Sequence, residues 1–278
     1  MASHSESAIP AVVTAIDPTK PHSARIYNYF LGGKDNFAAD RAVAEQAIAA
    51  WPGIRVAARE NRAFIGRAVR YLAAEAGIDQ FLDIGSGLPT ASNVHEVAQG
   101  INPAARVVYV DNDPIVHSHA RALLASTPQG SCAYIQADLR EPEKIIGSPL
   151  VRETLDFSRP VALILAAVVH FLIPADDPAR IIGTLAGALP AGSYLAASHG
   201  TDEYPPPESA DGVSSAYSGG GVSVCLRTAD EFGRLVFAGL ELVPPGVVMT
   251  TKWRPELGPH SDARPSDVST NVGVARKP

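Results

Sequence analysis

The sequence predicts an α/β fold built around a mostly parallel sheet, and three observations carry this prediction. From Gln80 onward, short apolar runs typical of strands alternate with stretches of helical character. The longest apolar run, 161–169, suits a central strand that is covered on both faces. A glycine-containing turn, 85–87, follows the first apolar run directly.

The expected elements follow in order along the chain. Strands are expected at 81–84, 106–111, 132–137, 161–169 and 193–198, with helices between them near 91–99, 114–125 and 178–188. The stretches 240–253 and 270–275 are extended in character and predict a terminal antiparallel hairpin. Two stretches rich in Pro and Ser, 204–221 and 255–269, are expected to be loops.

The chain is expected to have three parts. Residues 1–22 are expected to be flexible, because their prolines discourage regular structure. Residues 23–77 are Ala-rich, Arg-rich and amphipathic, which predicts a helical lid or cap. Within it, Asp35 or Asn36 could cap one helix, and the break at 51–53 separates it from the next. Residues 78–278 hold the alternating strands and helices.

Composition excludes several classes of protein. The 278 residues are 46% hydrophobic and 19% charged, as in an ordinary globular protein, and the net charge of −6 lacks the basic footprint of a nucleic-acid partner. The two cysteines lie in no metal-type spacing, so we predict no metal site and a reduced cytoplasmic setting. No signal-peptide pattern is present, and 161–169 is too short to span a membrane.

The first strand ends in a pattern that suits a nucleoside ligand with an ammonium group. Gly85 and Gly87, on either side of Ser86, allow the backbone to approach a ligand closely. Asp83 lies two positions before the first glycine, where its carboxylate would repel a pyrophosphate and attract an ammonium group. The alternative is a tight connection with no ligand.

Acidic residues also end the next two strands. Asp111, followed by Asn112, could accept from both hydroxyls of a ribose, and Asp138 could accept from the amine of adenine. Each has a simpler interpretation, since Asp111 could cap the helix after Pro114 and Asp138 could be a loop carboxylate. Ligands of open α/β sheets bind beyond the carboxyl ends of the strands, so the three acids together predict a nucleoside site.

Histidines end the fourth and fifth strands. His170 is the first candidate for a general base and His199 is the second, because a neutral imidazole can accept a proton near pH 7. Either one could instead be a core histidine bonded to a backbone carbonyl.

These motifs resemble those of class I S-adenosylmethionine-dependent methyltransferases. The resemblance lies in 81–89, 109–114 and 137–140. Narrower strings at 24–27, 31–37, 93–96 and 253–255 are similar to one bacterial family long catalogued as a domain of unknown function. The resemblance implies a Rossmann-like seven-stranded sheet, with 78–278 as the class I domain. It also implies S-adenosyl-L-methionine as cofactor, but it implies no particular substrate. We expect methyl transfer to an O or N nucleophile of a small-molecule acceptor. One departure is Pro89, where the class has a third glycine.

Further cofactor contacts are expected from residues near these motifs. Arg25, Asn61 and Arg62 are candidates for the methionine carboxylate, and the segment 32–36 could close as a lid. The full expected set adds Tyr27, Gly33, Lys34, Asn36 and Leu139 to the strand-end residues. The alternatives are a solvated Arg-rich helix face and, for 32–36, a simple helix–helix turn.

Two other functions compete with methyl transfer. An NAD-dependent oxidoreductase also has an acid after its second strand. Its fingerprint, however, has Gly or Ala at the sixth position of the turn, where this chain has Thr90. A catalytically silent module that binds S-adenosylmethionine as a sensor or scaffold is the second alternative.

Overall fold

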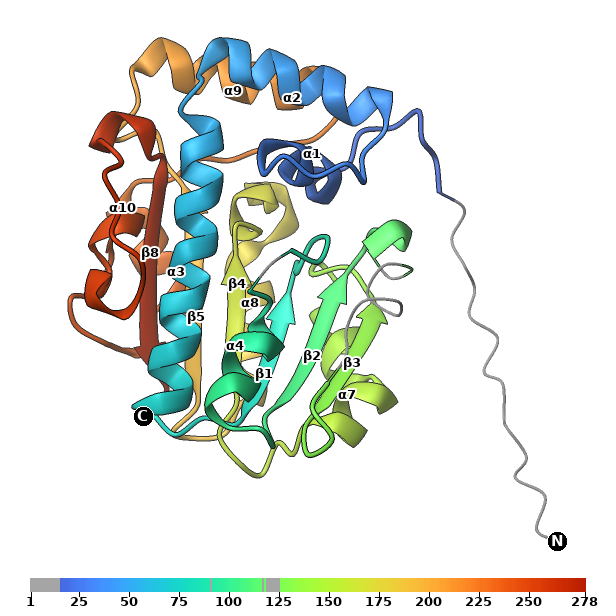
Figure 1. Ribbon diagram of the computed structural model, residues 1–278, viewed down its shortest axis with the longest axis vertical. Helices are drawn as coiled ribbons and strands as arrows, with labels where there is room; N and C mark the ends of the chain where they lie inside the picture. The colour runs from blue at the N-terminus through green and yellow to red at the C-terminus, as the bar shows by residue number, and fades with distance from the viewer. Residues whose placement is uncertain (1–15, 91, 117, 119–125) are drawn as a thin grey trace, which may run out of the picture.

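The fold is a single twisted sheet with helices on both faces and a helical layer over one end (Figure 1). The structure is a computed structural model, and it describes residues 16–90, 92–116, 118 and 126–278. The strands are β1 (Gln80–Ile84), β2 (Arg106–Asp111), β3 (Ser131–Gln136), β4 (Ala162–Ala166), β5 (Tyr194–Gly200), β6 (Glu241–Leu242), β7 (Val248–Met249) and β8 (Thr270–Arg276).

The strand order confirms the predicted mostly parallel sheet. It runs β3-β2-β1-β4-β5-β8-β6, with β1 to β5 parallel and β8 antiparallel to β5. The expected terminal hairpin is present, but its first arm is divided into β6 and β7, which both pair with β8. The sheet therefore has eight strands in seven positions.

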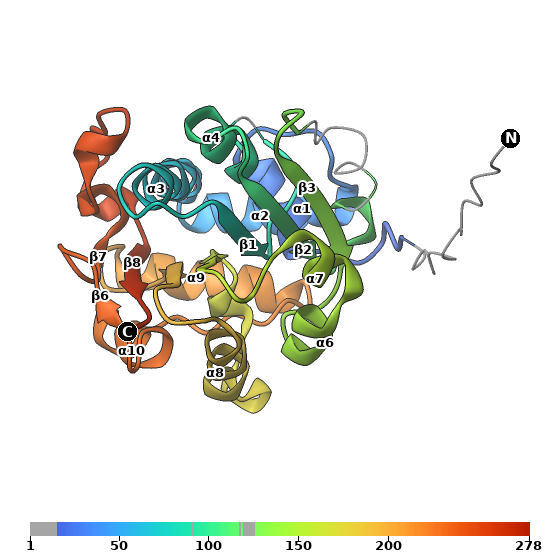
Figure 2. The same cartoon turned by 90° about the horizontal axis from the view of Figure 1, so that it is seen from below.

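Helices cover both faces and the carboxyl end of the sheet. They are α1 (Ser23–Phe30), α2 (Ala38–Ala50), α3 (Ile54–Ala74), α4 (Val94–Ile101), α6 (Pro142–Gly147), α7 (Pro149–Thr154), α8 (Pro178–Ala188), α9 (Pro207–Gly219) and α10 (Ala229–Val236). Short 3-10 turns are η1 (Val169–Phe171), η2 (Pro174–Asp176), η3 (Thr250–Lys252), η4 (Pro255–Leu257) and η5 (Pro265–Asp267). Figure 2 shows α3 and α4 on one face, and α6, α8 and α10 on the other.

The core has one apolar layer on each face of the sheet. On one face, Phe64 and Leu72 of α3 are buried with Phe81 of β1. On the other, Leu163 of β4 is buried with Ile181 of α8. Burial on both faces explains why the parallel strands read as continuous apolar runs in the sequence.

The predicted loop at 204–221 is wrong, because α9 forms there and packs along α2 (Figure 1). Pro207 takes the first helical position, where its missing N–H costs nothing. A Cβ on Gly212 would lie 2.6 Å from Ala50 Cβ, and a Cβ on Gly220 would lie 2.5 Å from Val43. Glycines that resembled loop signals therefore permit close helix–helix contact.

The start of α2 differs from the expectation, whereas its end agrees. Phe37 is the N-cap residue, and its backbone N–H donates to Asp40 Oδ2 at 2.8 Å, so neither Asp35 nor Asn36 has this role. The predicted break at 51–53 separates α2 from α3. Most of the expected helix at 114–125, and residues 1–15 of the expected flexible terminus, lie outside the described residues.

Candidate active site

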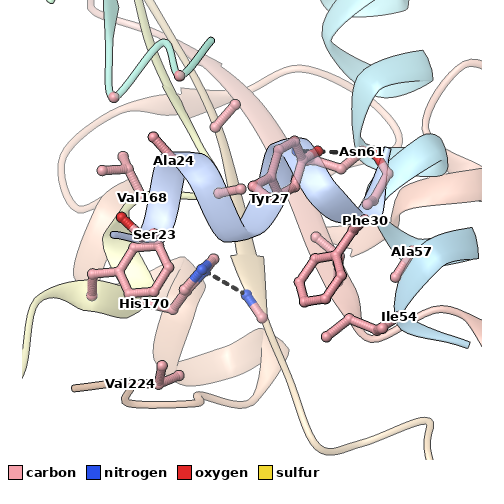
Figure 3. Close-up of a pocket in the computed structure, with 18 of the residues that line it drawn as sticks. Ser23, Ala24, Tyr27, Phe30, Ile54, Ala57, Asn61, Val168, His170 and Val224 are labelled. Atoms are coloured by element: carbon pink, nitrogen blue, oxygen red, sulfur yellow. Dashed lines mark hydrogen bonds between the residues drawn. The ribbon is translucent and has the colours of Figure 1, made fainter. Parts of the chain in front are cut away.

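A cavity of about 180 Å³ lies between the carboxyl ends of the strands and the helical layer formed by α1, α3 and α9. One end borders the glycine turn, and the other lies beneath apolar side chains of the helices. In Figure 3, Tyr27 of α1 reaches Asn61 of α3, Phe30 of α1 lies beside Ile54, and His170 lies below α1. The predicted residues that line it are Tyr27, Asn61, Arg62, Asp83, Gly85, Ser86, Gly87, Asn112 and His170.

The glycine turn depends on both of its glycines. Gly85 has a φ of +75°, and a Cβ there would lie 2.6 Å from Val168 Cγ2, so only glycine fits. Gly87 has a φ of +65°, but among the described residues, its two chain neighbours aside, no atom lies within 4 Å of where its Cβ would be. The backbone at Gly87 therefore borders open space, where a ligand can approach closely.

Asp83 is a buried carboxylate that faces the cavity. It is 6% exposed, and within the described part of the chain no protein group hydrogen-bonds to it. Burial raises the pKa of the Asp83 carboxyl to about 7, the nearby Arg62 opposes this shift, and Asp111 adds to it. A cationic ligand group would supply the missing countercharge and favour the ionised form.

Asn61 lines the cavity and carries a second unsatisfied group. Its Nδ2–H donates to the hydroxyl of Tyr27 at 2.9 Å, and that hydroxyl donates to the carbonyl of Ala58 at 2.9 Å. Asn61 is 3% exposed, and its buried Oδ1 has no hydrogen-bond partner among the described residues. Because an unpaired buried acceptor is costly, this oxygen suits an N–H or O–H of a ligand.

The geometry of His170 contradicts its expected role as a general base. Its Nδ1 accepts the backbone N–H of Gly200 at 3.2 Å (Figure 3), so in the neutral ring the proton is on Nε2. Burial, with smaller contributions from His199 and Arg227, lowers the pKa of His170 to about 3. His170 is thus a neutral hydrogen-bond donor at the cavity.

His199 is not brought to the cavity. Its Nδ1–H donates to the carbonyl of Gly200 at 2.6 Å, and its Nε2 accepts from Arg227 Nη1 at 2.9 Å. The side chain is fully buried, and burial is the main reason that the pKa of His199 falls to about 4. It corresponds to the alternative of a core histidine.

Arg25 is held by acids rather than facing the cavity. Its Nε lies 3.1 Å from Asp113 Oδ2 and 3.5 Å from Asp40 Oδ1, and its Nη2 donates to the carbonyl of Lys20. Arg25 thereby ties the start of α1 to α2 and to the end of β2. Arg25 does not line the cavity, although its buried Nη1 has no hydrogen-bond partner among the described residues.

The acids that follow β2 and β3 are engaged with the protein. Asp111 Oδ2 accepts the N–H of Gly87, and its Oδ1 accepts the N–H of Asp113. Asn112, which lines the cavity, donates from Nδ2 to Asp138 Oδ2 at 3.0 Å. Leu139 belongs to the buried core. Of this predicted group, only Asn112 reaches the cavity.

The segment 32–36 is a turn between α1 and α2 that does not line the cavity. Asn36 Nδ2 donates to Asn28 Oδ1 at 2.9 Å and to the carbonyl of Gly33 at 3.0 Å. A Cβ on Gly33 would lie 2.2 Å from Asn28 Nδ2, and Lys34 is exposed. The structure therefore favours the helix–helix turn, and α1 itself covers the cavity.

Sequence reasoning missed the apolar end of the cavity. Its side chains come from α1, α3, α9 and the loops after β4 and α9, and include Phe30, Ile54, Phe171, Val213, Tyr217 and Val224. In the sequence these residues look like ordinary helix or loop residues, and only the packing of α9 on α2 brings them together. Among the described residues no cluster suits a metal ion, and no helix is long and apolar enough to cross a membrane.

Comparison with known proteins supplies the family. A family profile described as S-adenosyl methyltransferase matches residues 11–278, nearly the whole chain. The chain belongs to this S-adenosyl methyltransferase family. The protein is an S-adenosylmethionine-dependent methyltransferase, which confirms the resemblance of its motifs and the predicted cofactor.

Two crystal structures of similar chains agree with this assignment. A DUF574 family protein of Streptomyces avermitilis is 46% identical, with a TM-score of 0.89 over 94% of this methyltransferase and 99% of that chain. A proposed methyltransferase of Thermobifida fusca is 45% identical, with a TM-score of 0.85 over 93% of this chain and 96% of that chain. At 12% identity, a methyltransferase of Anabaena variabilis shares the fold, with a TM-score of 0.50 over 95% of this chain and 99% of that chain. No curated protein matches the chain.

The cavity of this S-adenosyl methyltransferase fits the chemistry of its cofactor. S-Adenosylmethionine carries an ammonium group and a carboxylate at its methionine end. The cavity offers a partner of opposite charge for each, the carboxylate of Asp83 and the guanidinium of Arg62. The orphaned Asn61 Oδ1 adds an acceptor, and the open space beside Gly87 leaves room for close backbone contact.

Proposed function

We propose that the enzyme transfers a methyl group to an oxygen or nitrogen nucleophile of a small molecule bound beneath α1. The observation that carries this proposal is the continuity of the cavity, which extends from the glycine turn to the apolar helices. One end then suits the methionine part of the cofactor, and the other leaves space for a second ligand.

The residues of the polar end would hold the cofactor. Asp83 and Asn61 Oδ1 would take the ammonium group, Arg62 would take the carboxylate, and the turn at Ser86 and Gly87 would contact the ligand through its backbone. Asn112 would border the nucleoside part. Asp111 would act beneath the turn, where it already holds the N–H of Gly87.

Methyl transfer at this site would rest on position and exclusion of water. S-Adenosylmethionine supplies a methyl group on a positively charged sulfur, which is already a good electrophile. The protein must align the nucleophile with that methyl group, and α1, α3 and α9 would hold the acceptor in a largely apolar space. A lone pair of the nucleophile would form the new bond to the methyl group as the bond between that group and sulfur breaks, with its electron pair left on sulfur. Because His170 donates rather than accepts, a proton of the nucleophile would leave to water rather than to a histidine base.

Radiolabelled methyl transfer would test this proposal. The enzyme would be incubated with methyl-labelled S-adenosylmethionine and a small-molecule fraction of a bacterial extract, with Asp83→Ala as the matched control. We expect label in an extractable small molecule with the wild type and its loss with the variant. Binding of S-adenosylhomocysteine without any labelled product would favour the alternative of a silent sensor.

A further inference from the structure

The apolar end of the cavity contains no charged side chain among its described lining residues. Arg62 and Asp83 are the charged residues of the described lining, and both lie at the glycine-turn end. The wall opposite is formed by side chains such as Phe30, Ile54 and Val224. A charged acceptor placed there would lose its hydration and find no countercharge, which is unfavourable.

His170 and Tyr217 are titratable rings at this end, and both stay neutral. Burial lowers the pKa of His170 to about 3, and burial raises the pKa of the Tyr217 hydroxyl. Neither ring therefore provides a charge at neutral pH. The acceptor that matches this surface is itself neutral.

Aromatic rings form one side of the apolar end. The His170 and Phe171 ring centroids lie 4.4 Å apart at 59°, and the Phe171 and Tyr217 centroids lie 6.0 Å apart at 47°. Rings in such tilted contacts leave faces and edges that another flat ring can pack against. An aromatic compound would use this wall better than a flexible aliphatic one.

The polar contact at this wall has a defined direction. The Gly200 N–H occupies Nδ1 of His170, which leaves Nε2–H as the hydrogen-bonding group of the ring. The tautomer is thereby set by the fold.

We propose that the methyl acceptor is a neutral, flat aromatic compound that accepts a hydrogen bond from His170 Nε2–H. This inference rests on the proposed function and deepens it. His170 would determine specificity, because its Nε2–H would form a favourable hydrogen bond with one oxygen or nitrogen atom of an otherwise apolar ligand. Peptide and nucleic-acid acceptors are disfavoured, since their charges and backbone polar groups would lack partners here.

Four probes of similar size would test the inference by calorimetry on enzyme saturated with S-adenosylhomocysteine. They are β-naphthol, the non-bonding β-methylnaphthalene, the anionic β-naphthalenesulfonate and the non-planar decahydro-β-naphthol. We expect β-naphthol to bind tightest.

In His170→Asn, the amide oxygen can still accept from Gly200 but no N–H reaches the Nε2 position. We expect this variant to lose about 3- to 10-fold in affinity for β-naphthol and none for β-methylnaphthalene. His170→Gln, which restores an N–H near that position, should recover part of the loss.

The contrary outcomes are distinct. Sulfonate binding as tight as that of β-naphthol, or equal losses for both aromatic probes in His170→Asn, would overturn the inference while the proposed function stands. Competition between S-adenosylhomocysteine and β-naphthol would also overturn it, because the apolar end would then belong to the cofactor. Failure of S-adenosylhomocysteine itself to bind would instead overturn the proposed function.

Discussion

The carboxylate of Asp111 accepts a hydrogen bond from the backbone N–H of Gly87 at 2.8 Å. This contact joins the end of β2 to the glycine turn after β1, two neighbouring parallel strands. The second oxygen of Asp111 accepts the N–H of Asp113 at 3.0 Å. The acid that the sequence predicted to contact a ribose therefore supports the glycine turn.

Asp111→Ala should weaken the binding of S-adenosylhomocysteine by about 1.5–3 kcal/mol, the range for a hydrogen bond to a charged group, because the turn that borders the ligand loses the acceptor of its Gly87 N–H. It should also lower the free energy of unfolding by about 1–3 kcal/mol, because two backbone N–H groups lose their acceptor. Calorimetry and urea unfolding measure the two effects. Asp111→Asn, which keeps one acceptor oxygen, is the matched control and should lose less stability. Unaltered cofactor affinity in both variants would reduce Asp111 to a structural role.

Asp83→Asn should stabilise the ligand-free enzyme at neutral pH and above. Burial raises the folded pKa of Asp83 to about 7 from 3.8, so ionisation disfavours the folded state. The free energy of unfolding of the wild type should therefore fall as the pH rises from 3.8 to about 7, and that of the variant should not fall for this reason. Unfolding in urea at about pH 4 and about pH 8 should show a difference between the proteins only at the higher pH.

The same substitution should weaken binding of S-adenosylhomocysteine at pH 8, because the ligand ammonium loses its countercharge. Greater stability with weaker binding would mark Asp83 as a residue kept for ligand binding. A variant as stable as the wild type at both pH values, with equal affinity, would contradict both expectations.

The two glycines of the turn should respond differently to alanine. Gly85→Ala should lower the free energy of unfolding by about 2–4 kcal/mol, since a positive φ and an overlap with Val168 combine. Gly87→Ala has only the positive φ to accommodate, at about 1–2 kcal/mol. Its methyl group would occupy space beside the ligand, so cofactor affinity should fall more than stability. Equal unfolding midpoints for the two variants would contradict the close approach of Val168 to position 85.

His199→Leu should destabilise the fold by about 1–3 kcal/mol, because Arg227 Nη1 and the Gly200 carbonyl lose a buried partner. The binding of S-adenosylhomocysteine should remain unchanged in the folded variant. His260→Leu, at an exposed histidine, is the control and should change neither quantity. A folded His199→Leu protein with wild-type stability and no methyl transfer would restore His199 to a catalytic role.

The sheet and the glycine turn could be predicted because their signals are local. Buried parallel strands are continuous apolar runs, and a positive φ selects glycine at 85 and 87. The start of α4 carries a local signal too, because Asn93 and Glu96 form a capping box in which the Asn93 N–H donates to Glu96 Oε2; the helix expected from the sequence nevertheless spanned 91–99.

The remaining features depend on contacts between distant segments. Glycine and proline suggest a loop at 204–221, and only packing against α2 makes this segment a helix. Arg25 resembles a ligand contact until Asp40 and Asp113 are seen beside it. The role of His170 depends on the Gly200 N–H, 30 residues away, which fixes its tautomer. The sequence contains none of these distances.

Hydrogen exchange with and without S-adenosylhomocysteine tests the central claim most directly, namely that the cofactor binds between the glycine turn and α1. At saturating ligand, we expect slower exchange in 83–87 and in 23–30, and no change in the turn at 32–36. Lys34→Ala should leave this pattern and the affinity unchanged, because Lys34 is exposed and does not line the cavity. Equal exchange rates in 83–87 and 23–30 with and without the ligand, at a concentration where calorimetry shows saturation, would contradict the account.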